Sequence, residues 1–219
     1  MSESYNVIAI DGPAASGKSS VAKALARRLG FVYVNTGEMY RAVTWQVLES
    51  GVDPKDMDAV RACIAEMNIE CGVAGQQSTV SVNGANPGDA LVGEGVNASV
   101  SFIAKVPEVR QRLVDLQRAY ADRCNAVMEG RDIGSIVFPD TPYKFYIDAS
   151  EEVRAARRAK QGLKDSIGQR DKQDTTRRNS PLVIAEDAHV IDSSHLTVDG
   201  VTGEIIGRLK MKGFLNSDF

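Results

Sequence analysis

Short apolar runs and amphipathic stretches alternate at both ends of the chain, and this alternation predicts an α/β fold. The apolar runs have the length of buried parallel strands and lie at residues 7–10, 31–34, 127–128, 144–147 and 189–191. Helical patterning predicts helices at residues 21–29, 36–49, 57–67, 107–122, 150–161 and 199–212. We expect Thr36 and Asp199 to cap the helices that they begin. This order of elements is typical of a parallel sheet built from βαβ units.

The middle of the chain has a different character. From residue 68 to about 96 the sequence holds many glycines and two short β-like pieces, at residues 69–73 and 79–82. The dipeptide Asn83-Gly84 favours a tight turn, because both residues tolerate the positive φ angles that such a turn requires. We therefore expect a small antiparallel insertion here rather than another βαβ unit.

The overall composition restricts the class of protein. The chain has 219 residues, a hydrophobic content of 43% and a formal net charge of −3, which suit one sizeable core and argue against a nucleic-acid-binding surface. No apolar run approaches the roughly 18 residues that a membrane span needs, and the first residues lack the features of a secretory signal. The cysteines, Cys63, Cys71 and Cys124, lack metal-ligand spacing. We expect a cytoplasmic protein with reduced thiols and no nucleic-acid or membrane partner, and a monomer, since no long apolar stripe stands out.

The segment between the first strand and the first helix carries the most specific chemistry. It reads Gly12-Pro13-Ala14-Ala15-Ser16-Gly17-Lys18-Ser19, which matches G-x-x-x-x-G-K-[ST], the P-loop. Backbone N–H groups and the helix N-terminus would hold phosphates, Lys18 would reach the β- and γ-phosphates, and Ser19 would bind Mg²⁺. We expect Ser20 to join this ATP site. Arg157 and Arg158 either approach ATP as well or coat a helix surface.

Other charged groups narrow the choice among P-loop proteins. Between Arg154 and Arg178 there are nine basic and three acidic residues, which favours a lid that closes over anionic ligands. A switch GTPase would need an N-K-x-D element, and the nearest match, at residues 171–174, begins with Asp. Arginines spread along the chain suit phosphoryl transfer, in which charge develops on the phosphate oxygens. A phosphate acceptor needs no strong general base, whereas a hydroxyl acceptor would want one, which Asp132 could supply.

Three further motifs give the chain a family resemblance. They are N-T-G-E-M-Y-R at residues 35–41, E-G-R-D-I-G at 129–134 followed by V-F-P-D at 137–140, and R-D…D…R at 170–177 before S-P-L. In this order, over nearly the whole chain, they closely resemble bacterial cytidylate kinases. The resemblance implies ATP- and Mg²⁺-dependent transfer of phosphate to CMP or dCMP, giving CDP or dCDP.

The resemblance also implies the fold and its parts. It indicates a P-loop NTPase-type three-layer fold with a parallel central sheet, an inserted small monophosphate-binding β subdomain and a mobile lid. We expect one nucleoside monophosphate kinase domain over residues 1–219. Its core would comprise residues 1–62, 103–160 and 180–219, with the insertion at about 63–102 and the lid at about 161–179.

Site residues follow from the resemblance, position by position. The likeness implies that the acceptor phosphate is held by Arg41, Arg131 and Arg177, of which Arg131 and Arg177 would act in catalysis with Lys18. It implies that cytosine is read by Ser101, Arg110 and Asp132, that Arg170 and Asp174 face the sugar, and that Thr36 and Tyr40 line the acceptor site.

The sequence departs from the family pattern at residue 36, which is Thr for Ser, at residue 129, which is Glu for Asp, and in a short connection from Arg158 to Arg170. A P-loop kinase for another monophosphate or a small metabolite, and a regulatory nucleotide-binding module without turnover, stay open as alternatives.

Overall fold

One mostly parallel sheet forms the centre of the molecule. The structure is a computed structural model that describes residues 5–160, 174–175 and 181–216. In this part of the chain seven strands have the spatial order β3-β4-β2-β5-β1-β6-β7. Their bounds are β1 Val7–Asp11, β2 Val32–Asn35, β3 Ile69–Ala74, β4 Gln77–Val82, β5 Ala126–Gly130, β6 Lys144–Asp148 and β7 His189–Asp192. Neighbouring strands are parallel except for the β3–β4 pair.

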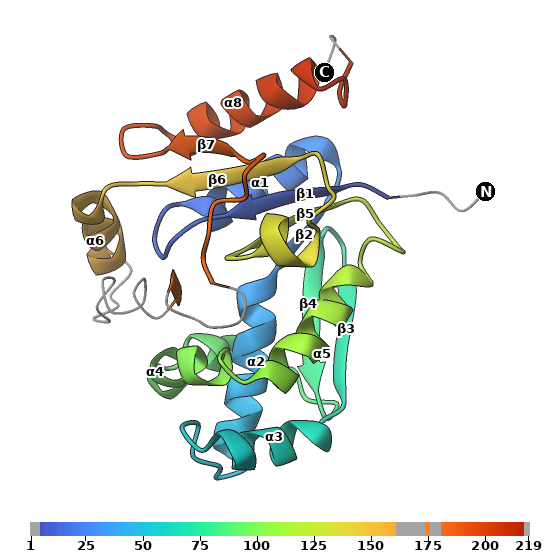
Figure 1. The fold of residues 1–219 in the computed structure, drawn as a ribbon, viewed down its shortest axis with the longest axis vertical. Coiled ribbons are helices and arrows are strands. Elements are labelled where there is room, and N and C mark those ends of the chain that lie inside the picture. The colour runs from blue at the N-terminus through green and yellow to red at the C-terminus, as the bar shows by residue number, and fades with distance from the viewer. Residues whose placement is uncertain (1–4, 161–173, 176–180, 217–219) are drawn as a thin grey trace.

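Helices cover both faces of this sheet, so the fold has the three layers that the family resemblance implies (Figure 1). The α-helices are α1 Lys18–Leu29, α2 Thr36–Glu49, α3 Met57–Ala65, α4 Glu94–Ile103, α5 Pro107–Arg118, α6 Glu151–Lys160 and α8 Val198–Met211. The described residues also include a 3₁₀ turn, η1 (Gly88–Val92), and a π-helical turn, η2 (Ile133–Val137). Among the described residues, none of the helices is both long and apolar enough to cross a bilayer.

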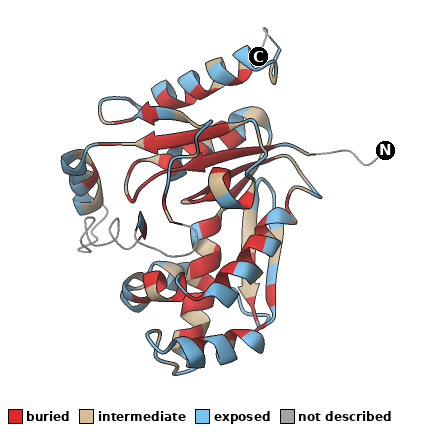
Figure 2. Ribbon diagram, viewed as in Figure 1, coloured by how far each residue is buried: buried red, intermediate tan, exposed pale blue. Residues whose placement is uncertain are grey.

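The core follows from the strand sequences. Every residue of β1 and β5 is buried, because helices or loops cover both faces of these two central strands (Figure 2). On one face, Ile8 and Ile10 pack with apolar side chains of α1 and α8. On the other, Ala9 packs with side chains of α5 and η2. A separate apolar cluster joins α2 to α3, α4, α5 and the β3–β4 hairpin.

The predicted elements are confirmed at nearly all positions, but two predicted caps are wrong. Asn35, not Thr36, is the N-cap of α2, and the Thr36 hydroxyl donates instead to the Glu129 carbonyl oxygen, 2.8 Å away. The N-cap of α8 is Thr197, whose hydroxyl accepts from the Gly200 N–H at 3.1 Å. Asp199 lies in the first turn of that helix, where a negative charge suits the helix dipole but does not cap it.

The antiparallel insertion is present, and it extends the main sheet. Strands β3 and β4 pair along their length, and β4 joins β2 where Tyr33 lies opposite Gln77. Asn83 and Gly84 form a turn with φ angles of 52° and 76°, although this turn follows β4 and does not connect the two strands. The predicted lid at about 161–179 falls outside the described residues, apart from Asp174 and Thr175.

Candidate active site

A single cavity brings together the predicted donor and acceptor residues. Its volume is about 610 Å³, and it opens beyond the carboxyl ends of β1, β2 and β5. Ligands of open parallel sheets bind at such edges, because the loops that follow the strands converge there. Among its lining residues are Ala14, Ala15, Ser16, Gly17, Lys18, Ser19, Ser20, Thr36, Tyr40, Arg41, Ser101, Arg110, Arg131, Asp132, Arg157, Arg158 and Asp174.

The P-loop has the backbone conformation that its glycines allow. Gly12 has φ of 155°, and a Cβ atom there would lie 2.1 Å from the Ile147 carbonyl oxygen, so no other residue fits. Gly17 has φ of 91° and immediately precedes α1. The first turn of α1 contains no acidic residue, which leaves its positive end available to phosphate. Gly12 and Pro13 shape the loop without lining the cavity.

Lys18 is the buried cation of this loop. Its side chain is mostly buried, and Nζ donates to the Pro13 carbonyl oxygen at 3.0 Å. Burial, followed by the neighbouring guanidinium of Arg131, lowers the pKa of Lys18 to about 7. A bound polyphosphate would favour the charged form, because an opposite charge nearby offsets both effects.

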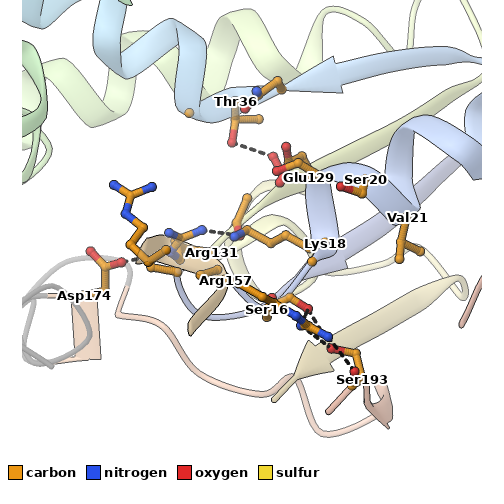
Figure 3. Close-up of a pocket in the computed structure, with 18 of the residues that line it drawn as sticks. Ser16, Lys18, Ser20, Val21, Thr36, Glu129, Arg131, Arg157, Asp174 and Ser193 are labelled. Carbon is orange, nitrogen blue, oxygen red and sulfur yellow. Dashed lines mark hydrogen bonds and ion pairs between the residues drawn. The ribbon is translucent and has the colours of Figure 1, made fainter. Parts of the chain in front are cut away.

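Two arginines of α6 donate hydrogen bonds to carbonyl oxygens of the P-loop and so support its backbone. Arg157 donates from Nη1 to the Ser16 carbonyl oxygen at 3.1 Å and from Nη2 to the Ser193 carbonyl oxygen at 2.7 Å. The Ser193 hydroxyl donates to the same Ser16 oxygen at 2.7 Å (Figure 3). Arg154 donates to the Ala14 carbonyl oxygen at 3.3 Å. Arg157 was predicted either to approach ATP or to coat a helix, and the structure adds a third arrangement in which it supports the loop.

Arg154 and Ser193 belong to the site although no sequence pattern predicts them there. Ser193 directly follows β7, and the segment from Leu196 to Val198 also lines the cavity. The rule that sites gather at the carboxyl ends of parallel strands could have indicated this segment. The contact of Arg154 with the P-loop depends on how α6 packs against that loop, so no local sequence pattern predicts it.

Another wall of the cavity carries a buried ion pair. Arg110 of α5 and Asp132, which lies between β5 and η2, form a salt bridge, and both are about 5% exposed. A second Arg110 nitrogen donates to the Ala104 carbonyl oxygen at 3.3 Å, and the guanidinium lies 5.4 Å from the centre of the Tyr40 ring. Ser101 lines the same wall. The three residues that the resemblance assigns to base reading therefore meet in one place, although the first and last of them are 31 positions apart in the sequence.

Asp11, at the end of β1, fixes the segment that carries this pair. Its carboxylate accepts from the backbone N–H groups of Ile133 and Gly134, each at 2.8 Å. Burial is the largest influence on this carboxyl group and raises its pKa to about 6, although the two hydrogen bonds oppose the rise. Asp11 thus links the strand before the P-loop to the first turn of η2.

Two more arginines add positive charge to the cavity. Arg131 donates from Nε to Asp174 at 2.8 Å, which places Asp174 beside the P-loop lysine pocket (Figure 3). Arg41 of α2 donates to the Leu91 carbonyl oxygen at 2.9 Å and to the Asn97 side chain at 2.8 Å. Both arginines line the cavity. The predicted residues Arg170 and Arg177 lie outside the described residues.

Glu129 completes the site at the end of β5. It is almost fully buried, and its Oε1 accepts from the Tyr33 hydroxyl at 2.8 Å. Burial and the neighbouring Glu129 charge raise the pKa of Tyr33, so the phenol keeps its proton and remains a donor. Gly130 follows, and a Cβ atom there would lie 2.7 Å from the Thr36 hydroxyl. The close approach of β5 to the start of α2 therefore depends on glycine.

Comparisons with known proteins agree with this geometry. The family described as cytidylate kinase matches residues 8–211. A cytidylate kinase of Geobacillus thermodenitrificans is 44% identical over 210 residues, covering 91% of this chain and 94% of the relative. One of Corynebacterium efficiens is 43% identical over 212 residues, covering 91% and 92%.

A solved structure of an uncharacterized protein from Eubacterium ventriosum has a TM-score of 0.52 and 17% identity, and the match covers 94% of this chain and 98% of that one. At that identity the likeness shows the fold alone. The family match extends from β1 into the last helix, α8, and the relatives match at nearly full length. The chain belongs to the cytidylate kinase family.

Proposed function

We propose that this protein transfers the γ-phosphoryl group of ATP to CMP or dCMP. One observation carries the proposal: the P-loop, the buried Arg110–Asp132 pair and Arg131 all line one cavity. Two nucleotides bound end to end on these walls would place their phosphates near Arg131 and Lys18. Family membership supports the same reaction, since the relatives are named cytidylate kinases.

The donor side holds charge with backbone groups and one lysine. Residues 12–20 would surround the ATP phosphates, and Lys18 would stabilise the charge that develops on the transferring group. Arg157 keeps the loop in shape by binding the Ser16 carbonyl oxygen. Arg158, which lines the cavity, remains a candidate for direct contact with ATP.

The acceptor side would read cytosine and hold its phosphate. Cytosine presents an amino donor beside acceptor atoms, so a carboxylate and an arginine together match its edge. Asp132 and Arg110 supply these groups, with Ser101 on the same wall. Arg41 and Arg131 are the described cations suited to the acceptor phosphate, and we assign Arg177 to the same role. Thr36 and Tyr40 would line the site, and Asp174 with Arg170 would face the sugar.

The residues present also fit a magnesium ion carried by ATP. Mg²⁺ prefers oxygen ligands, and proteins hold it with one or two oxygen-bearing side chains together with substrate phosphates. Ser19 and the Glu129 carboxylate line the cavity beside the P-loop and provide such oxygens. When bound, the ion would neutralise charge on the β- and γ-phosphates.

The structure disfavours a hydroxyl acceptor. Such an acceptor would need a general base, and Asp132 was the candidate from the sequence. Its carboxylate is instead paired with the Arg110 guanidinium in a buried salt bridge, an arrangement that suits hydrogen bonding to a base edge. A small-metabolite kinase is therefore the weaker alternative.

We further propose a cytoplasmic monomer with reduced thiols. Cys63, Cys71 and Cys124 form no disulfide in the structure, and burial raises the pKa of Cys71 to about 11, which keeps that thiol protonated and unreactive. Size-exclusion chromatography with light scattering tests the oligomeric state. A stable dimer at micromolar concentration would contradict this part of the proposal.

One assay tests the reaction itself. ADP release is measured with MgATP and each common nucleoside monophosphate or its deoxy form, and Lys18→Ala serves as a control for contaminating kinases. We expect turnover with CMP and dCMP, and weak or absent turnover with UMP, AMP and GMP. A preference for another monophosphate would overturn the substrate assignment. A lack of ADP with any acceptor would favour a regulatory nucleotide-binding module.

A further inference from the structure

The buried hydrogen bond between Tyr33 and Glu129 links a strand of the core to the donor site. Tyr33 lies in β2 and Glu129 in the parallel neighbour β5, where Tyr33 is in register with Val127. Successive side chains alternate between the two faces of a sheet, so Val127, Glu129 and Tyr33 project from the same face. The phenol therefore reaches the Glu129 carboxylate along the sheet, at 2.8 Å.

This bond holds the side chain of a glutamate whose backbone is also held. The Glu129 carbonyl oxygen accepts from the Thr36 hydroxyl at 2.8 Å, which fixes the backbone. The Tyr33 hydroxyl fixes the side chain, and Ser19, the second residue of α1, lies beside the same phenol. Glu129 and Ser19 line the cavity, whereas Tyr33 stands behind them in the core.

We propose that Tyr33 is a positioning residue that orients the Glu129 carboxylate toward the magnesium ion of bound MgATP. The inference rests on the proposed function. Groups that hydrogen-bond to metal-associated carboxylates set their orientation, and losing one typically weakens metal binding about 10- to 100-fold. Glutamate has three side-chain torsions, so a fixed orientation requires a partner for its carboxylate.

The Tyr33 hydroxyl also determines which cation the Glu129 carboxylate faces. Glu129 lies close enough to Lys18 to stabilise the ammonium charge. Without the phenol, the carboxylate would be drawn further toward Lys18, because that ammonium is a buried opposite charge. Tyr33 therefore keeps Glu129 at the Ser19 edge of the cavity and leaves Lys18 for the phosphates.

The test uses metal binding as well as activity. Tyr33→Phe removes only the hydroxyl, and Mn²⁺ is the probe, measured by electron paramagnetic resonance in the presence of a non-hydrolysable ATP analogue. We expect Mn²⁺ to bind about tenfold more weakly than to the wild type, while the analogue alone binds with unchanged affinity. With CMP as acceptor, a higher Mg²⁺ concentration should restore most of kcat.

A matched control is available in the same protein. Tyr120 is similarly buried and donates its hydroxyl to the Gly72 carbonyl oxygen at 3.0 Å, but Gly72, unlike Glu129, does not line the cavity. Tyr120→Phe should leave Mn²⁺ affinity unchanged although it also loses one buried hydrogen bond. A second variant, Tyr33→Leu, keeps an apolar side chain without an oxygen and should reproduce the weakening seen in Tyr33→Phe.

A double-mutant cycle separates positioning from general packing. Glu129→Gln removes the charge, so adding Tyr33→Phe should cause no further loss of Mn²⁺ affinity if Tyr33 acts through Glu129. Unchanged Mn²⁺ binding in Tyr33→Phe, or additive losses in the double variant, would overturn the inference while CMP phosphorylation by the wild type still upheld the proposed function. Absence of CMP phosphorylation by the wild type would overturn the proposed function instead.

Discussion

The donor and acceptor walls of the cavity bind anionic ligands in different ways. The donor wall comes from one continuous segment, residues 14–21, and relies on backbone groups, a helix N-terminus and Lys18. The acceptor wall comes from α2, α4, α5 and the end of β5, and relies on side chains such as Arg41, Arg110 and Asp132. Phosphate has the same chemistry in every nucleotide, so backbone groups are sufficient to bind it. A base edge differs between nucleotides and requires side chains in a particular arrangement.

The two walls also differ in what supports them. The donor loop is braced by Arg154, Arg157 and Ser193, which bind its carbonyl oxygens. The acceptor wall is braced by Asp11, which holds two backbone N–H groups next to Asp132. Because Asp11 also adjoins the P-loop in sequence, one short segment of β1 supports both walls.

The largest effect should come from the only lysine of the P-loop. In Lys18→Ala we expect kcat to fall about 10³-fold, because the lost charge acts on the transferring phosphoryl group. Affinity for CMP should change little, since CMP occupies the other wall. Steady-state kinetics with both substrates measures this split. Lys55→Ala, at an exposed position, is the control and should stay within about twofold of the wild type. An equal loss in kcat and CMP affinity would contradict the separation of the walls.

A second change tests the backbone conformation of the donor loop. In Gly12→Ala the added methyl group would meet the Ile147 carbonyl oxygen, and we expect the free energy of unfolding to fall by about 3 kcal/mol. Gly30→Ala is the matched control: it also has a positive φ, but no atom lies within 4 Å of the added carbon, so about 1 kcal/mol is expected. Urea unfolding compares the two variants. Equal losses would mean that φ alone, and not the close contact, determines the cost.

A third change tests whether the acceptor wall reads the base. Asp132→Asn replaces an acceptor for the cytosine amino group with an amide that can also donate to uracil. We expect the preference for CMP over UMP in kcat/KM to fall about 10- to 100-fold, while KM for ATP stays within about twofold. Competition assays with both acceptors measure the preference directly. An unchanged preference would remove Asp132 from base reading.

The smallest effect concerns the shared support, Asp11. Its pKa is raised to about 6 from the usual 3.8, so the folded protein holds this proton more tightly than the unfolded chain does. The resulting stabilisation is present below about pH 4 and is lost as the pH rises through about 6. Asp11→Asn cannot titrate, so the free energy of unfolding of the variant minus that of the wild type should increase by about 1–2 kcal/mol from pH 4 to 6.5. Urea unfolding across this range tests the sign, with Asp115→Asn on α5 as a control for the loss of one carboxylate. A difference that falls with pH would contradict the assignment.

The donor wall could be predicted from the sequence because its chemistry is local. The spacing of Gly12, Gly17, Lys18 and Ser19 defines the loop without knowledge of the fold. The acceptor wall was predicted only through family resemblance, since a lone Arg110 on a helix with other arginines has no local pattern. The braces Arg154, Ser193 and Tyr33 were not predicted at all. Their partners are distant in sequence, as with Ser193 and Ser16, or depend on strand register, as with Tyr33 and Glu129.

The sequence by itself determined the strand–helix order and the phosphate-binding loop, because hydrophobic period and glycine spacing act over a few residues. It did not determine the N-caps of α2 and α8. Thr36 and Asp199 lie within a residue or two of the true N-caps, and competing hydrogen bonds decide which residue begins the helix. Only the tertiary structure decided which polar side chains pair within and behind the cavity walls. Pairing Arg110 with Asp132 and Tyr33 with Glu129 depends on how strands align and helices dock, and those arrangements are set by packing over the whole core.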